Sequence, residues 1–325
     1  MTSLPRYRIL LPAAGALLAL LLFPLLGQVF YTELVAKTLV LAIFAMSLDL
    51  LVGYTGLVSF GHAAYFGIAA YTVALITPKT AAASLWLALP ASVAVAAAAA
   101  FLIGLFVLRS RGIYFIMVTL AFAQMAFYIF HDSSLGGGSD GIYINDKPSM
   151  ELFGFKPFNL ETSEHIYYFI LVLTVATYLF LNRVLKSNFG RALAGIRSNE
   201  HRMSAMGYNT FRYKLAAFTL AGALAGLAGF LHAILFGFVT PELLAWHQSG
   251  NVLLVVILGG IGSLVGSVLG AFAFVAIEEF SQGLFSHWQL FMGGFIILVV
   301  FALPGGLAGI PARLRRALVK GDEDE

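Results

Sequence analysis

Residues 187–214 read SNFGRALAGIRSNEHRMSAMGYNTFRYK, a polar and basic stretch with long apolar runs on both sides. This pattern predicts two short helices. Asn188 can cap the first helix, and Ser198 or Asn199 can cap the second. Gly207 is well placed to end the second helix in a left-handed conformation. The apolar face of the first helix consists of Phe189, Leu193 and Ile196.

A connection between two membrane spans does not require a segment as compact as this one. Its small residues leave the backbone approachable, while Arg191, Arg197 and Arg202 keep it out of the bilayer. Two interpretations follow from the pattern alone. The segment is either a docking element for a cytoplasmic partner or an ordinary basic cytoplasmic loop.

Composition places the rest of the chain in lipid. The 325 residues are 60% hydrophobic and 11% charged, whereas globular chains average roughly 45–50% apolar and about 25% charged residues. The sequence contains no cysteine, which excludes disulfides, thiolate metal sites and cysteine nucleophiles.

A span needs about 20 mostly apolar residues to cross a hydrocarbon core of roughly 30 Å. Ten such runs are expected, some of them short and next to glycine-rich breaks. We expect the first run to remain as a span, with a cleaved signal peptide as the alternative. The runs are 9–27, 34–52, 63–77, 85–108, 112–131, 165–186, 213–236, 249–261, 266–282 and 289–304.

Lysine and arginine set the expected orientation, because they concentrate on the cytoplasmic side. With both termini inside, 15 of the 19 basic residues are cytoplasmic. A single crossing over residues 249–282 would put three arginines outside, so we expect a hairpin broken at 259–262. The basic residues left outside are Lys37, Lys79, Lys147 and Lys156, and the tryptophans Trp86, Trp246 and Trp288 lie at the outer interface.

These observations predict one transmembrane domain over residues 1–312 and a charged cytoplasmic tail over 313–325. The domain includes an outer segment at 132–164 and the cytoplasmic element at 187–212. The outer segment carries six acidic residues against two lysines. It is either a surface for an extracytoplasmic partner or a solvated connector.

Glycines interrupt the chain after the second run and again at 259–270. Irregular backbone in a membrane is tolerated only where protein or a water-filled cavity surrounds it, so such breaks indicate a translocation path. One break in each half suggests repeats, which five spans per half would make inverted. We expect path or gate residues at Gly53, Tyr54, Thr55, Gly56, Ser59, Gly61, His62, Gly259, Gly260 and Gly262.

The alternative for both breaks is tight helix packing through small residues. For the segment at 221–229 and for the alanine run at 96–100, packing is the interpretation that we favour.

Few ionisable residues lie within the expected spans, and each is near an interface. They form no chain of carboxylates such as a proton-coupled carrier would need. The sequence also lacks the GxxxxGK[ST] and HExxH motifs, so it offers no phosphate-binding loop and no zinc-protease motif. The ionisable residues are Asp49, His62, His232, Glu278 and Glu279.

Four motifs resemble the LivM-type permease subunits of branched-chain amino acid ABC importers, in order along nearly the whole chain. They are GYTGLVSFGHAAYFGIAAYTVAL (53–75), GGGSDGI (136–142), GRALAGIRSNEHRMSAMGYNTFRYKLAAFTLAGALAGLAG (190–229) and VILGGIGSLVGSVLGAF (256–272). Two departures stand out. The family usually has Asn where this chain has Asp49, and it commonly has proline where this chain has Ser267.

The resemblance implies an all-α permease subunit of the bacterial inner membrane that performs no covalent chemistry and binds no cofactor itself. It further implies a second, homologous permease subunit of the LivH type, two cytoplasmic ATPase subunits that use ATP and Mg²⁺, and a periplasmic binding protein, with no nucleic acid. The residues implied for ATPase coupling are Gly190, Arg191, Arg197, Glu200 and Gly207. Relatives carry urea, short amides or aromatic acids. A stand-alone secondary transporter or channel is the alternative from another class.

Overall fold

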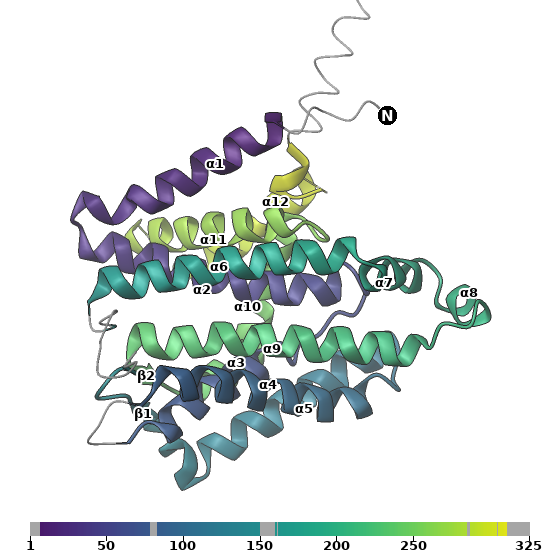
Figure 1. Cartoon of the computed structure of the whole chain (residues 1–325), viewed down its shortest axis with the longest axis horizontal. Helices are drawn as coiled ribbons and strands as arrows, with labels where there is room; N and C mark the ends of the chain where they lie inside the picture. The colour runs from purple at the N-terminus through teal and green to yellow at the C-terminus, as the bar shows by residue number, and fades with distance from the viewer. Residues whose placement is uncertain are drawn as a thin grey trace, which may run out of the picture.

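The computed structural model describes residues 7–78, 83–149, 160, 162–284, 287–303 and 305–310, and these form a bundle of α-helices (Figure 1). The tail 313–325 and much of the outer segment lie outside the described residues. The helices are α1 (Tyr7–Leu22), α2 (Val29–Val52), α3 (His62–Ile76), α4 (Leu85–Val107), α5 (Ile113–His131), α6 (Ser163–Lys186), α7 (Asn188–Ser198), α8 (Glu200–Ala205), α9 (Thr210–Phe236), α10 (Trp246–Gly259), α11 (Leu264–Leu284) and α12 (Trp288–Ala302).

Two short strands join these helices at the end of the bundle opposite α7 and α8. Strand β1 (Ile142–Tyr143) pairs antiparallel with β2 (Phe238–Val239) and so links the outer segment to the end of α9. The 3₁₀ turns are η1 (Phe23–Leu26), η2 (Ser134–Gly136), η3 (Gly138–Asp140), η4 (Pro241–Leu244) and η5 (Leu307–Gly309).

Each of the expected apolar runs contains a helix. Among the described residues, six helices are long and apolar enough to cross a membrane: α2, α4, α5, α6, α9 and residues 264–283 of α11. The prediction of an all-helical membrane protein is therefore confirmed. Helix α3 has 15 residues and α10 has 14. At 1.5 Å per residue they are only about 21–23 Å long, so neither crosses a core of roughly 30 Å as a helix alone.

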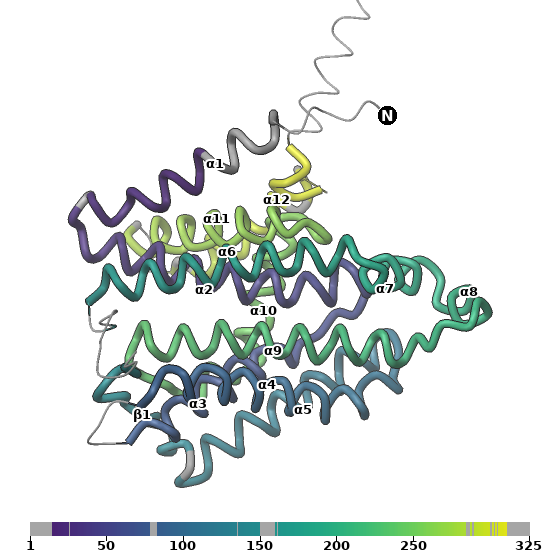
Figure 2. Tube along the Cα trace, viewed as in Figure 1, coloured from purple at the N-terminus to yellow at the C-terminus, as the bar shows by residue number. Residues whose placement is uncertain are grey.

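Helix α9 lies at the centre of the bundle, packed against α2, α3 and α4 (Figure 2). Its small residues allow this close packing. A Cβ atom on Gly226 would overlap the side chain of Ala96 and lie 3.4 Å from that of Ala69, and one on Gly229 would overlap the Phe66 carbonyl. The packing interpretation of residues 221–229 is confirmed.

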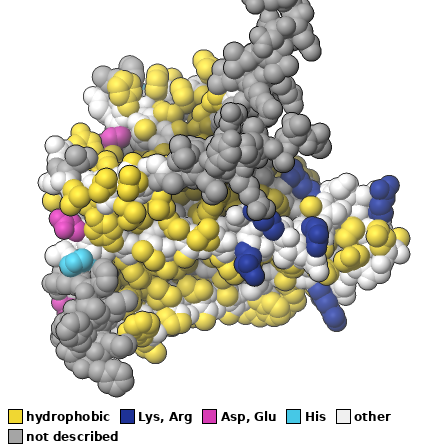
Figure 3. Space-filling model, turned by 45° about the horizontal axis from the view of Figure 1, so that its top comes forward, with side chains coloured by type: hydrophobic (Ala, Val, Ile, Leu, Met, Phe, Trp, Pro, Cys, Tyr) yellow, Lys and Arg dark blue, Asp and Glu magenta, His cyan; other side chains and the backbone are white. Residues whose placement is uncertain are grey.

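Charge is distributed unevenly between the two ends of the bundle. Helices α7 and α8 project beyond the other helices at one end. On the face drawn in Figure 3, hydrophobic side chains form a broad band, lysine and arginine gather toward the α7–α8 end, and acidic side chains lie toward the other. This is the arrangement expected of a chain that crosses a bilayer with its α7–α8 end in the cytoplasm.

The packing of α9 gives the first prediction. Gly226→Leu should lower the free energy of unfolding by about 1–3 kcal/mol, because overpacking a tight helix contact forces neighbours apart. The matched control is Gly294→Leu on α12, where a Cβ atom would meet nothing within 4 Å. Thermal unfolding of both variants in detergent tests this, and equal midpoints would contradict it.

Candidate coupling and translocation site

The segment at 187–212 forms the two helices that its sequence predicts, with one correction at the first cap. Helix α7 begins at Asn188, so Ser187 occupies the cap position, and the Asn188 side chain instead accepts a hydrogen bond from the Arg191 guanidinium. Asn199 caps α8 as expected, since its Oδ1 accepts from the backbone N–H of Arg202 at 2.9 Å.

The second helix ends as predicted at Gly207, which has φ +86°. The N–H of Tyr208 donates to the carbonyl of Met203 at 3.1 Å, and the N–H of Gly207 donates to the carbonyl of Ser204 at 3.0 Å. This pair of bonds satisfies carbonyls that the helix would otherwise leave unpaired and turns the chain back toward α9.

One face of the element packs on the bundle and the other is open. Leu193 and Ile196 are buried, and Phe189 stacks on Tyr213 of α9. Gly190 is buried at the turn from α6 to α7, where a Cβ atom would overlap the backbone of Leu185. The predicted apolar face of α7 therefore anchors the element.

The open face carries apolar side chains as well as charges. Met206 is 66% exposed and Tyr208 is 39% exposed, and Arg191 of α7 and Arg202 of α8 are also exposed. Apolar groups exposed on a part of the protein that faces water are typical of an interaction surface.

Glu200 anchors the start of α8. Its Oε1 lies 2.6 Å from Nζ of Lys214, which is only 9% exposed. Burial raises the pKa of the Glu200 carboxyl, but its hydrogen bond to Lys214 and the charge of that ammonium outweigh burial and hold the pKa below its ordinary value. The ion pair therefore fixes α8 to α9.

Arg197, at the end of α7, joins this element to both glycine breaks. Its guanidinium donates a hydrogen bond to the carbonyl of Gly53. The Asp49 carboxylate accepts from the N–H of Gly262 at 2.7 Å, and the hydroxyl of Tyr54 donates to the carbonyl of Gly262 at 2.9 Å. The two breaks thus meet at the α7 end of the bundle.

This junction depends on a close backbone approach. A Cβ atom on Gly53 would lie 2.6 Å from the Cα of Gly262, so no other residue fits without moving the break. A cleft of about 480 Å³ opens beside the junction. It is lined by Gly53, Tyr54, Ala194, Arg197, Ser198, Ile261 and Gly262.

Only some of the expected path residues reach this cleft. Thr55 is buried and donates to the carbonyl of Leu51, and the buried Ser59 hydroxyl accepts from the N–H of Gly61. His62 is fully buried. Its Nε2 lies 2.9 Å from the Ser47 hydroxyl and its ring stacks on Phe44.

The glycines of the two breaks also differ in the residues that surround them. Gly56 lies at the junction, where a Cβ atom would be 3.3 Å from Cγ of Arg197, whereas Gly259 and Gly260 pack against residues 266–267 and 305–308. Because both breaks lie at one end of the bundle, they are not the equivalent segments of an inverted repeat, which would place them at opposite ends.

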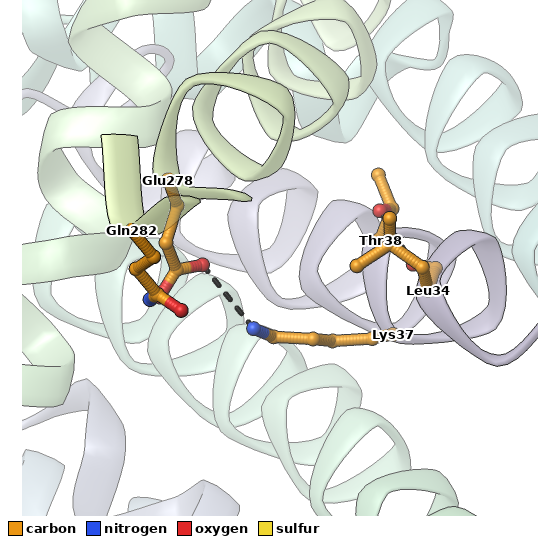
Figure 4. A network of polar contacts seen from close by, with 5 residues as sticks. All are labelled: Leu34, Lys37, Thr38, Glu278 and Gln282. Carbon is orange, nitrogen blue, oxygen red and sulfur yellow. Dashed lines mark hydrogen bonds and ion pairs between the residues drawn. The ribbon is translucent and has the colours of Figure 1, made fainter. Parts of the chain in front are cut away.

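One charged pair was not predicted from the sequence. Lys37 was expected outside, but α2 begins at Val29, so Lys37 lies about 12 Å along the helix. Its Nζ is 3.2 Å from Oε2 of Glu278 on α11 (Figure 4). The signal was present, since both residues interrupt apolar runs with opposite charges.

Comparison of the sequence with known proteins places the chain in a family. Residues 30–301 match the family described as the branched-chain amino acid transport system / permease component. The chain belongs to this permease family. No solved structure gives a significant match.

Two relatives named LivM match most of the chain. The permease is 31% identical over 313 residues to the high-affinity branched-chain amino acid transport system permease protein LivM of Escherichia coli K12, covering 90% of this chain and 73% of the relative. The Salmonella typhimurium LivM matches equally well. The autoinducer 2 import system permease protein LsrC of Klebsiella pneumoniae is 32% identical over 46% of this chain and 44% of the relative.

The Glu200–Lys214 pair gives a prediction about pH. Because the pKa of Glu200 is lower in the folded chain than its ordinary value of 4.5, the pair stabilises α8 above that pH. This stabilisation is lost as the pH falls through the folded pKa. Amide hydrogen exchange in α8, corrected for its intrinsic pH dependence, should stay slow from neutral pH down to the ordinary Glu pKa of 4.5 and accelerate below it. Glu200→Gln should remove this dependence, and an unchanged pH profile in that variant would refute the role of the pair.

Proposed function

We propose that the chain is a permease subunit of an ATP-binding-cassette importer that takes up branched-chain amino acids and forms half of the translocation path. Family membership and the likeness to LivM over 90% of the chain support this. One structural observation supports the proposal independently of sequence similarity. Arg197 of the projecting element contacts Gly53 in the first glycine break, so the surface that would meet an ATPase is linked to the path.

In the bilayer we propose ten crossings, with both termini cytoplasmic and the α7–α8 end facing the cytoplasm of a bacterial inner membrane. The gathering of basic residues at this end supports the orientation (Figure 3). Helices α3 and α10 would cross with the help of the irregular segments that flank them. Five crossings per half would make the two halves inverted repeats.

The proposed complex includes a second, homologous permease subunit of the LivH type, two cytoplasmic ATPase subunits that bind ATP and Mg²⁺, and a periplasmic binding protein. In this chain the ATPase would dock on α7 and α8. The exposed Met206 and Tyr208 suit insertion into an apolar groove, and Arg191 and Arg202 suit acidic groups at its rim. The binding protein would meet the segment at 132–164.

Transmission would run from α7 through Arg197 to the junction. A shift of α7 moves the guanidinium, and with it the carbonyl of Gly53. Gly53 is packed against Gly262, which Asp49 and Tyr54 hold. ATP-driven movement of α7 would therefore open or close both breaks together, which switches access at the cytoplasmic end.

Two other functions remain as alternatives. A related importer would carry urea, short amides or aromatic acids through the same architecture. A stand-alone secondary transporter or channel would use residues 187–212 only as a connector. Transport by the purified chain alone, reconstituted in liposomes under an ion gradient, would favour the latter.

Docking is tested by co-purification from detergent-solubilised host membranes. Met206→Glu should abolish recovery of the ATPase while the second permease still co-purifies, because a charge on the exposed apolar face cannot enter an apolar groove. Ser139→Glu, at an exposed position at the other end of the bundle, is the control. Retention of the ATPase by Met206→Glu would place docking elsewhere.

Transmission is tested by separating ATP hydrolysis from uptake. Arg197→Met should leave the complex assembled and hydrolysing ATP, while leucine uptake in proteoliposomes falls roughly tenfold or more, the effect expected from losing one charge-assisted hydrogen bond. Arg183→Met is the matched control, because Arg183 is an exposed arginine of α6 outside the projecting element. Normal uptake by Arg197→Met would exclude this route.

A further inference from the structure

A second cavity, of about 220 Å³, lies among α2, α3, α9, α10 and α11, away from the junction. Binding sites for drug-sized ligands measure roughly 300–1,000 Å³, so this cavity suits a smaller solute. Its apolar lining consists of Val40, Leu41, Phe44, Phe66, Leu243 and Phe274. Branched aliphatic and aromatic walls of this kind match an aliphatic side chain.

One wall of the cavity carries both signs of charge. Lys37 and Glu278 line it and form the ion pair with Nζ and Oε2 3.2 Å apart, and their side chains keep 40% and 20% of their surface exposed. Figure 4 shows the two side chains reaching toward each other from α2 and α11. Charges along membrane helices are costly and mark solute pathways or water-filled cavities.

Further polar groups complete the lining. Gln248 and Asn251 of α10 and His232 of α9 belong to the cavity wall. Within the described part of the chain, Nδ1 of His232 is buried without a hydrogen-bond partner. Buried polar groups are normally hydrogen-bonded, so this ring is available to a ligand. The site therefore combines a cation, an anion, neutral polar groups and an apolar pocket.

We infer that this cavity is a binding site on the translocation path for a zwitterionic α-amino acid with an aliphatic side chain. The solute carboxylate binds the Lys37 ammonium and the solute ammonium binds the Glu278 carboxylate, in place of their mutual ion pair. The side chain lies among Val40, Phe44 and Phe66. This site rests on the proposed function and specifies where within the chain the solute is held.

Charge balance decides which solutes the site accepts. The Lys37–Glu278 pair has no net charge, so a zwitterion replaces one ion pair by two and adds no net charge to a low-dielectric region. An aromatic acid brings an uncompensated negative charge, which is expensive to bury. Urea and short amides carry no charge with which to separate the pair. The site therefore favours amino acids over these alternative substrates.

The distance between the cavity and the junction is consistent with a site on the translocation path. Lys37 lies 12 residues before Asp49 along α2, which corresponds to about 18 Å. The solute would thus stop on the outer side of the closed junction and proceed when the junction opens. Weak binding at such a stop is required, because a path must release what it binds.

The first arm of the test uses the complete importer in proteoliposomes. Lys37→Met combined with Glu278→Gln removes both charges together and avoids leaving one of them unpaired. Leucine uptake should fall roughly tenfold or more, as expected when charge-assisted hydrogen bonds are lost, with co-purification of the ATPase unchanged. The control is Glu279→Gln. Glu279 is exposed and does not line the cavity, so the importer with this substitution should take up leucine normally.

The second arm measures occupancy of the cavity. Because the chain has no cysteine, a single cysteine introduced into the cavity is the residue of this chain that a thiol reagent modifies. In the detergent-solubilised complex, a small thiosulfonate reagent should modify Asn251→Cys more slowly when leucine is present. 4-Methylpentanoate, which lacks the ammonium, should not protect. Protection should disappear in the Lys37→Met, Glu278→Gln background. Tyr143→Cys, 72% exposed in the outer segment, should be modified at the same rate with and without leucine.

The two arms separate failure of the site from failure of the proposed function. If the unaltered importer takes up leucine but the neutral pair transports normally and leucine protects no cavity cysteine, the site is wrong and the function stands. If the unaltered importer takes up no branched-chain amino acid, the proposed function fails and the site assignment fails with it.

Discussion

The hydrogen bond from the N–H of Gly262 to the Asp49 carboxylate, 2.7 Å long, holds the functional end of this bundle together. Hydrocarbon offers no partner to an exposed backbone group, so a helix that breaks near a membrane must find its partners in the protein. Asp49 supplies one for the break after α10, and Tyr54 supplies another. Because these residues flank the break after α2, neither break can move independently of the other.

Much of this architecture could be predicted because membrane helices follow simple rules of length, apolarity and charge. The ends of the projecting element were also predictable, since Asn199 and Gly207 act through bonds local to the chain. Asn188 was assigned wrongly because Ser187 and Asn188 are both suitable cap residues, and only the turn after α6 decides between them.

What could not be predicted depends on contacts between distant segments. His62 stands in a glycine-rich stretch that suggests a path, yet its ring is enclosed by Ser47 and Phe44 of α2. Lys37 looked like an outer residue because α2 starts earlier than its apolar run indicates, and its partner Glu278 lies 241 residues away. Hydropathy carries no information about such pairs. The glycine breaks were recognised, but their meeting at one end was not.

The small pairing of β1 with β2 has a mechanical consequence. Ile142 pairs with Val239, and the N–H of Ile144 donates to the carbonyl of Gly237 at 2.9 Å. These bonds fasten the outer segment to the short connection between α9 and α10, the helix that carries Gln248 and Asn251. A displacement of the outer segment would therefore be transmitted over a short distance, through these backbone hydrogen bonds, to the cavity lined by Gln248 and Asn251.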